Sequence, residues 1–383
     1  MSIILFGGAG AEGRTIGNIL AKETDVEKIV VFDRSEKRAN RAIQEIGAKA
    51  EARIGDVDDH DGMVKLMKES DMVINMVGPF YRHGTKVLSA AIEAKKNYVD
   101  ICDDYDAVRS LLALDGEAKN AGVTALITMG SSPGVCNVLA KYGADKLDQT
   151  NEINISWCVH YFAGEGGAGA GLHGYHMMSG NVPQYLDGKW VDVPAGSGEE
   201  LIEFPGCGTT KCYYVGHSEP ITLPHYIKGV KTVTNKGNIL PEWIGDYERK
   251  LAQLGLTMER EMRIRAGLTV IPVEVLLRVE FEHHKDKDKG RIWGGFRVDV
   301  KGVKNSREAS YIYFLPPEIS CGAMSLSTAL PCAVGALMVM RGEFKDQGVS
   351  SPEALDPKKF LSLLAKRGMD CYEIERVPRR IEI

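Results

Sequence analysis

Short apolar runs alternate with amphipathic segments along the first third of the chain. The runs predict strands at 2–6, 28–33, 51–57, 71–77, 97–102 and 124–129. Between the first two runs, Ile16, Ile19 and Leu20 recur at helical spacing, and helical patterns also separate the later runs. Strands and helices that alternate in this way predict an α/β fold with a parallel, doubly wound sheet.

The hydrophobic period changes after residue 150. Residues 153–162 alternate between apolar and polar positions, and two further alternating runs, 291–300 and 307–315, predict an antiparallel hairpin. A mainly antiparallel sheet with few helices forms a different layer from the first sheet, so we expect a second, α+β domain. The apolar segment 321–342 has a helical pattern and is a candidate to return to the first domain.

A glycine-rich turn joins the first predicted strand to the first predicted helix. Gly8, Gly10 and Gly13 form the pattern GxGxxG, with Ala11 and Glu12 between the last two glycines. Between a strand and a helix this pattern binds dinucleotides, because glycine lets the backbone amides approach the pyrophosphate at the helix N-terminus. The sequence therefore predicts a Rossmann-type domain that binds a nicotinamide dinucleotide.

The second strand ends in Asp33, twenty residues after Gly13. An acid at this point accepts a hydrogen bond from the ribose 2′-hydroxyl and repels a 2′-phosphate, so we expect NAD rather than NADP. Arg34 and Arg38 follow closely and leave NADP open. Further coenzyme candidates lie at the ends of other strands, namely Asp56, Val57, Val77, Gly78, Pro79, Asp100 and Ile101. Asp56 is equally suited to cap the helix that follows it.

The composition narrows the class of protein. A chain of 383 residues is long enough for two domains, and its 44% hydrophobic and 26% charged residues are typical of a globular protein. The net charge of -5 gives no general attraction to nucleic acid or to an anionic membrane. No apolar run approaches the length of a membrane span, and the N-terminus carries no export signal. The eight cysteines are scattered singly, so we expect a cytoplasmic protein without a disulfide framework or a metal site.

Four segments are similar to one known family. They are 76–104 (MVGPFYRHG and onward), 130–148 (GSSPGV and onward), 216–224 (GHSEPITLP) and 335–357 (GALMVMRGEF and onward). They resemble the saccharopine dehydrogenase family, in particular its lysine 6-dehydrogenase-like branch. The resemblance implies a nicotinamide-dependent oxidoreductase that acts on a carbon–nitrogen bond in saccharopine, lysine or carboxynorspermidine metabolism. It also implies a second domain inserted into the first, which gives a dinucleotide-binding domain, a substrate and dimerisation domain, and a returning segment at 1–132, 133–325 and 326–383.

The predicted first domain offers two groups of candidate substrate and catalytic residues. Phe80 and Tyr81 follow the fourth strand, at the edge where the substrate meets the nicotinamide. Asp103 belongs to an acidic cluster, with Asp100 and Asp104, at the end of the fifth strand. Such a cluster suits a cationic amine substrate, and it suits helix capping equally well.

The predicted second domain offers two further groups. His173 and Tyr175 lie in the glycine-rich segment 162–180, which we expect to form a flexible lid over the substrate. His217 and Glu219 lie in the loop-like GHSEPITLP segment. We rank His217 first as the catalytic acid–base group, because an imidazole titrates in the useful range and a carboxylate can hold its tautomer. The alternative is that His217 only satisfies a buried carbonyl.

Arg263 is a candidate to bind a substrate carboxylate, together with Arg265 on the same strand face, although a solvated face explains the pair as well. We expect an NAD(P)-dependent oxidoreductase that deaminates a lysine-like amino acid or reduces the matching imine. A carboxynorspermidine- or saccharopine-type reductase is the enzymatic alternative, and a non-catalytic NAD(P)-sensing protein is the alternative of another class. We also expect a homodimer through the antiparallel sheet, because 296–300 and 311–315 carry apolar residues that one core face does not absorb.

Overall fold

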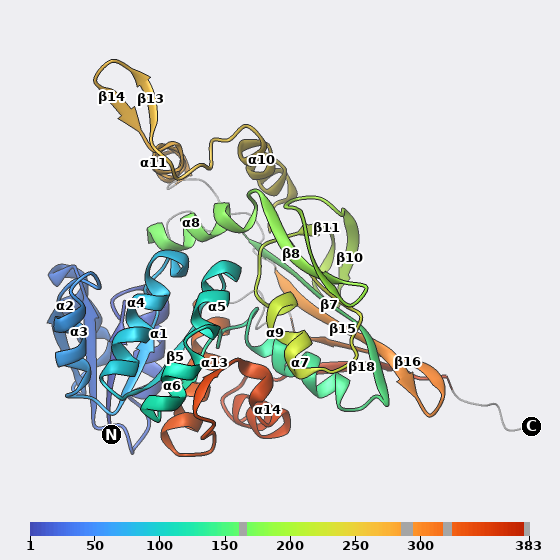
Figure 1. Ribbon diagram of the computed structural model, residues 1–383, viewed down its shortest axis with the longest axis horizontal. Coiled ribbons are helices and arrows are strands. Elements are labelled where there is room, and N and C mark those ends of the chain that lie inside the picture. Colours follow the sequence, from blue (N-terminus) through green and yellow to red (C-terminus); the bar gives the residue numbers. More distant parts are fainter. Residues whose placement is uncertain (161–166, 285–293, 317–323, 379–383) are drawn as a thin grey trace, which may run out of the picture.

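The computed structural model describes residues 1–160, 167–284, 294–316 and 324–378 (Figure 1). Seven parallel strands of this part of the chain form the first sheet, in the order β17-β6-β5-β4-β1-β2-β3. They are β1 (Ser2–Phe6), β2 (Lys28–Asp33), β3 (Ala50–Ile54), β4 (Met72–Asn75), β5 (Asn97–Asp100), β6 (Thr124–Leu126) and β17 (Gly348–Ser350). The predicted doubly wound sheet is confirmed. Its strand order reverses between β1 and β4, and ligands bind at the carboxyl ends of the strands at such a point.

Both faces of the first sheet are buried. Along β1, Ile3 and Leu5 belong to one hydrophobic core, whereas Ile4 and Phe6 belong to the other. Helices cover both faces, which explains why the strands are almost continuously apolar. One core includes α1 (Ala11–Leu20), α2 (Glu36–Ile46) and α13 (Met324–Met340), and the other includes α3 (His60–Met67), α4 (Phe80–Glu93), α5 (Tyr105–Leu112) and α6 (Asp115–Ala121).

The second sheet is mixed and mainly antiparallel, as expected. Its main path runs β10-β11-β12-β7-β15-β16-β18, with β8 paired to β12 and β9 paired to β8. Only the pair of β12 with β7 is parallel among the pairs in this sheet of the described chain. The strands are β7 (Gln149–His160), β8 (Asn181–Leu186), β9 (Lys189–Pro194), β10 (Glu200–Phe204), β11 (Gly208–Tyr214), β12 (Thr232–Leu240), β15 (Gly295–Lys304), β16 (Arg307–Phe314) and β18 (Tyr372–Arg376).

The predicted hairpin is β15 and β16, joined by a two-residue turn. Asn305 and Ser306 have positive φ angles of 51° and 62°, the conformation that tight hairpin turns require. The reason given above for a homodimer through these strands is wrong. The helix α7 (Val135–Ala144) packs so closely on the sheet that a Cβ at Gly143 would lie 2.9 Å from Cγ2 of Val300. The apolar side chains of the hairpin are buried, namely Val298, Val300, Tyr311, Ile312, Tyr313 and Leu315.

The C-terminal part of the chain visits both sheets. α13 packs in a core of the first sheet, and β17 pairs in parallel with β6. The chain then turns through α14 (Pro357–Ala365), and β18 pairs with β16 of the second sheet. We expected the whole returning segment to stay with the first domain. Residues 372–376 instead belong to the second sheet, because the chain turns back to it after α14. The domain boundaries themselves stay predictions.

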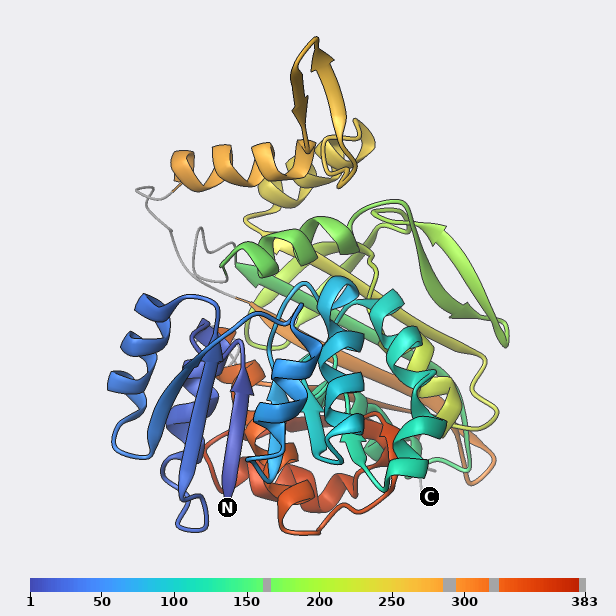
Figure 2. The same cartoon turned by 60° about the vertical axis from the view of Figure 1, so that its left-hand side comes forward.

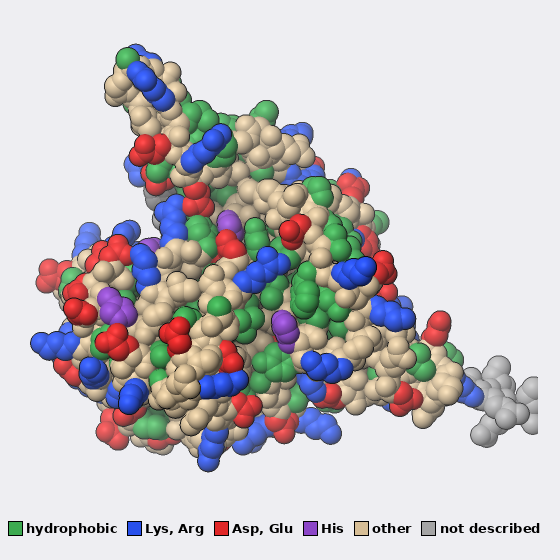
Figure 3. Space-filling model, in the orientation of Figure 1, with side chains coloured by type: hydrophobic (Ala, Val, Ile, Leu, Met, Phe, Trp, Pro, Cys, Tyr) green, Lys and Arg blue, Asp and Glu red, His purple; other side chains and the backbone are tan. Residues whose placement is uncertain are grey.

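Residues 242–284 form a projection that we call the arm (Figures 1 and 2). It consists of α10 (Glu242–Gln253), the hairpin of β13 (Met262–Arg265) and β14 (Leu268–Val270), and α11 (Pro272–His284). Figure 3 shows the arm standing out from the body of the molecule, with a hollow between it and the first domain. None of the helices in the described ranges is both long enough and apolar enough to cross a bilayer.

Two further helices precede the arm in the chain. The helix α9 (Glu219–Tyr226) follows β11, and α8 (Gly167–Met177) lies between the arm and the first domain. The expectation of a flexible loop over 162–180 is wrong for residues 167–177. These residues form α8, which packs on the arm and on the first domain. Residues 162–166 lie outside the described residues.

Candidate active site

The glycine turn fits a dinucleotide. A Cβ at Gly13 would lie 2.5 Å from Cα of Gly8, so the turn and the helix can meet this closely only with glycine. Helix α1 begins at Ala11, and its N-cap residue Gly10 provides no side-chain cap for the first-turn amides. Those amides point out of the helix N-terminus, where a pyrophosphate would satisfy them. The turn therefore provides the cradle that NAD(P) requires.

Glu12, in the first turn of α1, faces the same region. Burial, and then the negative charge of Asp103, raise the pKa of Glu12 to about 8. The carboxyl is therefore mostly neutral at pH 7, which avoids repulsion of the coenzyme phosphates. Its Oε2 atom is buried and has no hydrogen-bond partner in the described part of the protein.

Asp33 ends β2, as predicted, and its side chain is only 3% exposed. One oxygen accepts a hydrogen bond from the Ser35 amide at 2.9 Å, and both accept from the Arg38 guanidinium, at 2.9 and 3.0 Å. Arg38 is 57% exposed and can turn toward a ligand, while Arg34 lies on the surface beside it. The position that reads the 2′ group of the coenzyme thus contains a carboxylate and a guanidinium together.

The other coenzyme candidates fall into two groups. Asp56, Val57, Val77, Gly78, Pro79 and Ile101 lie just past the ends of β3, β4 and β5, at the edge where the coenzyme binds. Asp56 is exposed, and it does not cap the next helix, because the Asp59 side chain accepts the Gly62 amide there instead. Asp100 is fully buried, and it accepts the amides of Cys102 and Thr128 at 3.0 and 2.7 Å. It holds the chain between two strand ends, and we no longer expect it to touch the coenzyme.

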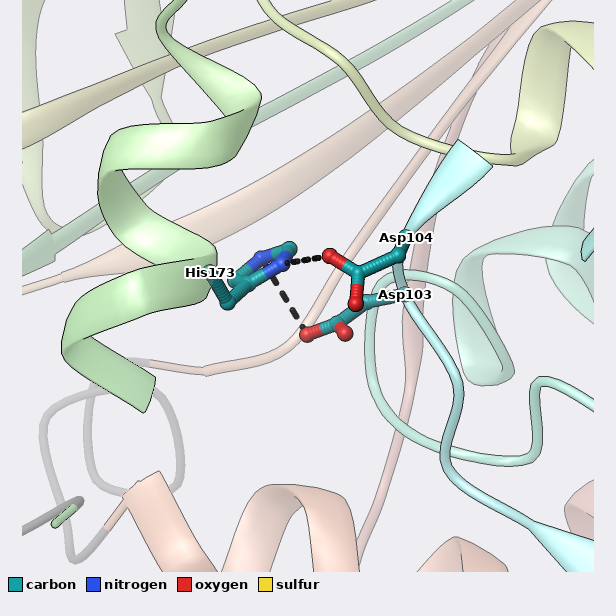
Figure 4. Close-up of side chains that lie close together, drawn as sticks. All are labelled: Asp103, Asp104 and His173. Carbon is teal, nitrogen blue, oxygen red and sulfur yellow. Dashed lines mark hydrogen bonds and ion pairs between the residues drawn. The ribbon is translucent and has the colours of Figure 1, made fainter. Parts of the chain in front are cut away.

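The acidic cluster and the predicted lid meet in one ion-pair network (Figure 4). His173, on α8, directs Nδ1 to Oδ1 of Asp104 at 2.7 Å and Nε2 to Oδ2 of Asp103 at 3.2 Å. Asp104 also accepts the Phe80 and Tyr81 amides, at 2.8 and 3.2 Å, and so caps the N-terminus of α4. The helix-capping half of the expectation is therefore observed at Asp104, whereas the side chain of Asp103 is 30% exposed and its contact with a cationic substrate stays a prediction.

The pKa values of these three residues depend on burial and on the charges of one another. Burial lowers the pKa of His173, but Asp103 and Asp104 outweigh it and raise the pKa to about 9. Burial raises the pKa of Asp103, whereas the hydrogen bond from His173 overcomes burial at Asp104 and lowers the pKa there. The three residues also offer ligand atoms within 4.8 Å of one another, a spacing that suits a metal ion. Since both nitrogens of His173 already face carboxylates and the ring keeps its proton at pH 7, we describe the cluster as an ion-pair network.

His217 and Glu219 lie behind this network. The rings of His217 and His173 are 5.6 Å apart, and Nδ1 of His217 is 3.5 Å from Oε2 of Glu219, too far for a hydrogen bond. Within the described residues neither of these two atoms has a hydrogen-bond partner, although both are buried. Burial raises the pKa of Glu219, but the charge of His217 and the hydrogen bond from Ser132 outweigh it, and the pKa falls below its usual value. The Nδ1 atom of His217 is thus ion-paired with a buried carboxylate but makes no hydrogen bond within the described residues.

The motif GSSPG positions Glu219 from the first domain. Gly130 and Gly134 approach so closely that a Cβ at Gly134 would lie 1.9 Å from the Gly130 oxygen. This tight turn presents Ser132, whose Oγ donates to Oε1 of Glu219 at 2.5 Å. Ser132 follows the sixth predicted strand, and its chain position makes it a candidate at the ligand-binding edge of the sheet, but its contact with Glu219 is not visible in the sequence.

Tyr81 lies between the first domain and the arm, and its role in binding substrate stays a prediction. Its ring stacks on His176 at a centroid distance of 4.3 Å, and His176 stacks on Tyr105 at 5.4 Å. The Tyr81 hydroxyl donates to Glu259 of the arm. Phe80, in contrast, is buried in the core beneath α4, so the expectation that it binds substrate is wrong.

Two predicted residues lie away from the cluster. Tyr175 is two positions after His173, and side chains at this spacing point to different faces of a helix. Its hydroxyl donates to Glu280 of α11 at 2.5 Å, and its ring packs among apolar residues of the arm. Arg263 is exposed on the arm hairpin. A register shift between Arg263 and Arg265 interrupts the regular alternation on which the expectation of a shared strand face was based. Neither residue joins the candidate site in this structure.

Comparison with known proteins gives consistent matches over the whole chain. The saccharopine dehydrogenase NADP binding domain matches residues 3–126, and the saccharopine dehydrogenase C-terminal domain matches residues 173–369. The carboxynorspermidine synthase of Vibrio cholerae is 26% identical, with 98% of each chain covered. The carboxyaminopropylagmatine dehydrogenase of Synechocystis is 24% identical, with 99% of each chain covered.

Two solved structures share the fold. Apo saccharopine dehydrogenase (L-Glu forming) from Saccharomyces cerevisiae superposes with a TM-score of 0.73 at 16% identity, covering 98% of this chain and all of that one. The homospermidine synthase of Legionella pneumophila, solved in complex with NAD, gives a TM-score of 0.63 at 13% identity and covers 100% of this chain and 95% of that one. At these identities the likeness concerns the fold alone.

Proposed function

Since the chain belongs to the saccharopine dehydrogenase family, we propose that it reduces the imine formed between a diamine and a carboxylated aldehyde. The class of activity follows from the family and the relatives: the protein is an NAD(P)-dependent oxidoreductase that acts on an amine or imine. The substrate is our proposal. We choose the carboxynorspermidine-type reductase, which was the enzymatic alternative given above, because the full-length relatives are named for carboxylated polyamines.

The acidity of the cleft supports a substrate with several positive charges. Five carboxylates from the two domains lie around the site, namely Asp103, Asp104, Asp106, Glu219 and Glu259, against the three histidines that pair with them and the Arg82 guanidinium. A neutral or anionic substrate would gain little from this arrangement, whereas an ammonium group is attracted to it. This surplus of carboxylates is the observation on which the proposal rests.

We propose His217 as the group that gives a proton to, or takes one from, the substrate nitrogen. When bound, the nicotinamide coenzyme supplies or accepts the hydride. The free Nδ1 of His217 and the nearby Glu219 carboxylate support an acid–base role, since the carboxylate stabilises the protonated ring. The raised pKa of His173 supports a different role for that residue: as a fixed cation it lowers the pKa of Asp104 and opposes the effect of burial on the pKa of Asp103.

The test is a screen of substrates at the nicotinamide absorbance band. We expect the purified protein to oxidise NADH or NADPH when a diamine and a carboxylated aldehyde are present together, and not with either alone. Reduction of NAD(P) by lysine or saccharopine would favour the lysine-like substrate instead. Tight coenzyme binding without turnover of any amine would support the sensor alternative and contradict our proposal.

The finer choice of coenzyme and the location of the protein are also proposals. We propose that NAD(H) is preferred, because Asp33 lies where a 2′-phosphate would sit. We propose a cytoplasmic location, which the scattered, singly spaced cysteines of the sequence support.

We also propose that the protein is a homodimer, through a different surface from the one expected. Large exposed apolar side chains concentrate on and beside the arm, namely Trp243, Tyr247, Leu254, Leu256, Ile264, Leu268, Val275 and Val279. Burying such a surface against a second copy removes apolar area from water. Sedimentation at micromolar concentration tests this proposal, because a monomer there would contradict it.

A further inference from the structure

Glu259 links the arm to the first domain at the mouth of the cleft. It lies on the segment between α10 and β13, and its carboxylate accepts from the Tyr81 hydroxyl and pairs with the Arg82 guanidinium. The side chains of Glu259 and Arg82 are 28% and 39% exposed, so the ion pair is in contact with solvent. A solvent-exposed pair of this kind contributes about 1 kcal/mol or less, so another cation can replace Arg82 at little cost.

The position of Tyr81 relates Glu259 to the acidic cluster. The Tyr81 amide donates to Asp104 at 3.2 Å, while its hydroxyl donates to Glu259. The two carboxylates therefore lie at opposite ends of one tyrosine residue. A flexible chain with an ammonium group at each end, separated by a few methylene groups, spans a similar length. Asp103, next to Asp104, is the exposed acid at the inner end of this path.

The wall between the two ends suits a methylene chain. It is formed by the stacked rings of Tyr81, His176 and Tyr105. The faces that stack on each other are covered, so the remaining ring faces and the ring edges are the parts that can pack against methylene groups and attract the cations at their ends. His176 in turn is held by Asp106, with Nε2 3.2 Å from the carboxylate.

We propose that Glu259 binds the distal ammonium group of a diamine substrate, and that Arg82 occupies this carboxylate until the diamine enters. The near amine then lies beside Asp103, where its nitrogen joins the carbon that is reduced. This inference rests on the proposed function and names the residue that recognises the far end of its diamine, and so distinguishes a diamine from a monoamine. The arm thereby selects the substrate as well as covering the cleft.

The first test compares three variants with two kinds of amine. With a carboxylated aldehyde and a three- to five-carbon diamine, Glu259→Gln should raise the diamine KM about tenfold or more, while kcat changes little. With propylamine in place of the diamine, KM should be the same as in the wild-type protein. Arg82→Gln should lower the diamine KM, because it removes the competing cation. Glu261→Gln, on the same segment with its carboxylate exposed, is the matched control and should change neither value.

The variants separate a substrate site from a structural contact. If Glu259 only fastens the arm to α4, Glu259→Gln and Arg82→Gln both break the same ion pair. The two variants should then shift KM in the same direction, both for the diamine and for propylamine. That result would overturn the inference.

A second measurement does not depend on turnover. Calorimetry of the diamines with the coenzyme-loaded protein should show binding that Glu259→Gln weakens about tenfold and Glu261→Gln leaves unchanged. Equal binding by wild type and Glu259→Gln, or no binding to either, would also overturn the inference. A wild-type protein that binds diamines through Glu259 but reduces no imine would contradict the proposed function alone.

Discussion

The two sides of the cleft hold their polar groups in different ways. On the first domain, carboxylates are fixed by backbone amides: Asp33 by Ser35, and Asp104 by the start of α4. On the second domain, His173 and Glu259 reach across the cleft and are held by side chains of the first domain. His217 stands near them with an unpartnered nitrogen. A group fixed by the backbone keeps its place when the cleft opens, whereas a group held across the cleft loses its partner.

This difference suggests a division of work. The first side has the rigid geometry needed to hold a coenzyme, which must be bound in one place before any substrate arrives. The second side has the groups that are held only by side-chain contacts with the first domain, and such contacts can exchange for a substrate or a proton. Substitutions on the first side should therefore affect coenzyme binding, and those on the second side should affect turnover of the amine.

The largest expected effect is at His217. His217→Ala should lower turnover roughly a hundredfold or more, because it removes the acid–base group at the substrate nitrogen. The coenzyme Kd, measured by fluorescence titration, should stay within about twofold of the wild-type value. Near-normal turnover in this variant, with turnover lost in His173→Phe, would reverse the roles of the two histidines.

A smaller effect is expected at His173, and it depends on pH. The folded-state pKa of about 9 is higher than the unfolded value, so the stabilisation from this residue is complete below about pH 6.5 and is lost as the pH rises through 9. His173→Gln should lower the unfolding free energy by on the order of 1 to 3 kcal/mol at pH 6 and by much less at pH 9.5. Urea unfolding at the two pH values measures this difference. An equal loss at both values would mean that the ring stays neutral in the folded protein.

The sequence was sufficient to predict the first side of the cleft, because local pattern determines it. In a parallel sheet each strand end lies at the same edge, so chain position alone predicted that Asp33 and Asp103 lie at the edge of the sheet where ligands bind. The exceptions depend on side-chain direction. Phe80 turned into the core and Asp100 toward two backbone amides, and neither is visible in a pattern of apolar and polar residues.

The second side depends on contacts between distant segments. The antiparallel hairpin was predicted because its strands alternate and its turn is short, but helix α8 was expected as a loop since glycines are frequent there. Its packing on the arm and the first domain outweighs that propensity. Glu259 gave no sequence signal at all, because its partners Tyr81 and Arg82 are far away in the chain.

On the first side, the expected effect concerns the choice of coenzyme. Arg38→Gln should raise the NADPH Kd about tenfold and leave the NADH Kd within about twofold, because Asp33 then meets the 2′-phosphate without its partner cation. Turnover with saturating NADH should not change. Arg41→Gln is the matched control, since Arg41 lies on the same helix and pairs with Glu45. An unchanged NADPH affinity in Arg38→Gln would show that Arg38 does not shield Asp33 from the phosphate.

The smallest expected effect is at Tyr175. It tests whether the direction in which a side chain leaves α8 decides its role, rather than its closeness in sequence to His173. The hydroxyl of Tyr175 donates to Glu280 inside the arm, whereas His173 faces the opposite domain. Tyr175→Phe should therefore leave kcat and KM within about twofold, and lower the unfolding free energy by about 1 kcal/mol, the usual contribution of one hydrogen bond. Steady-state kinetics and urea unfolding measure the two quantities. A large loss of turnover with unchanged stability would mean that the phenol turns into the cleft during catalysis, and the division between the two faces of α8 would then be wrong.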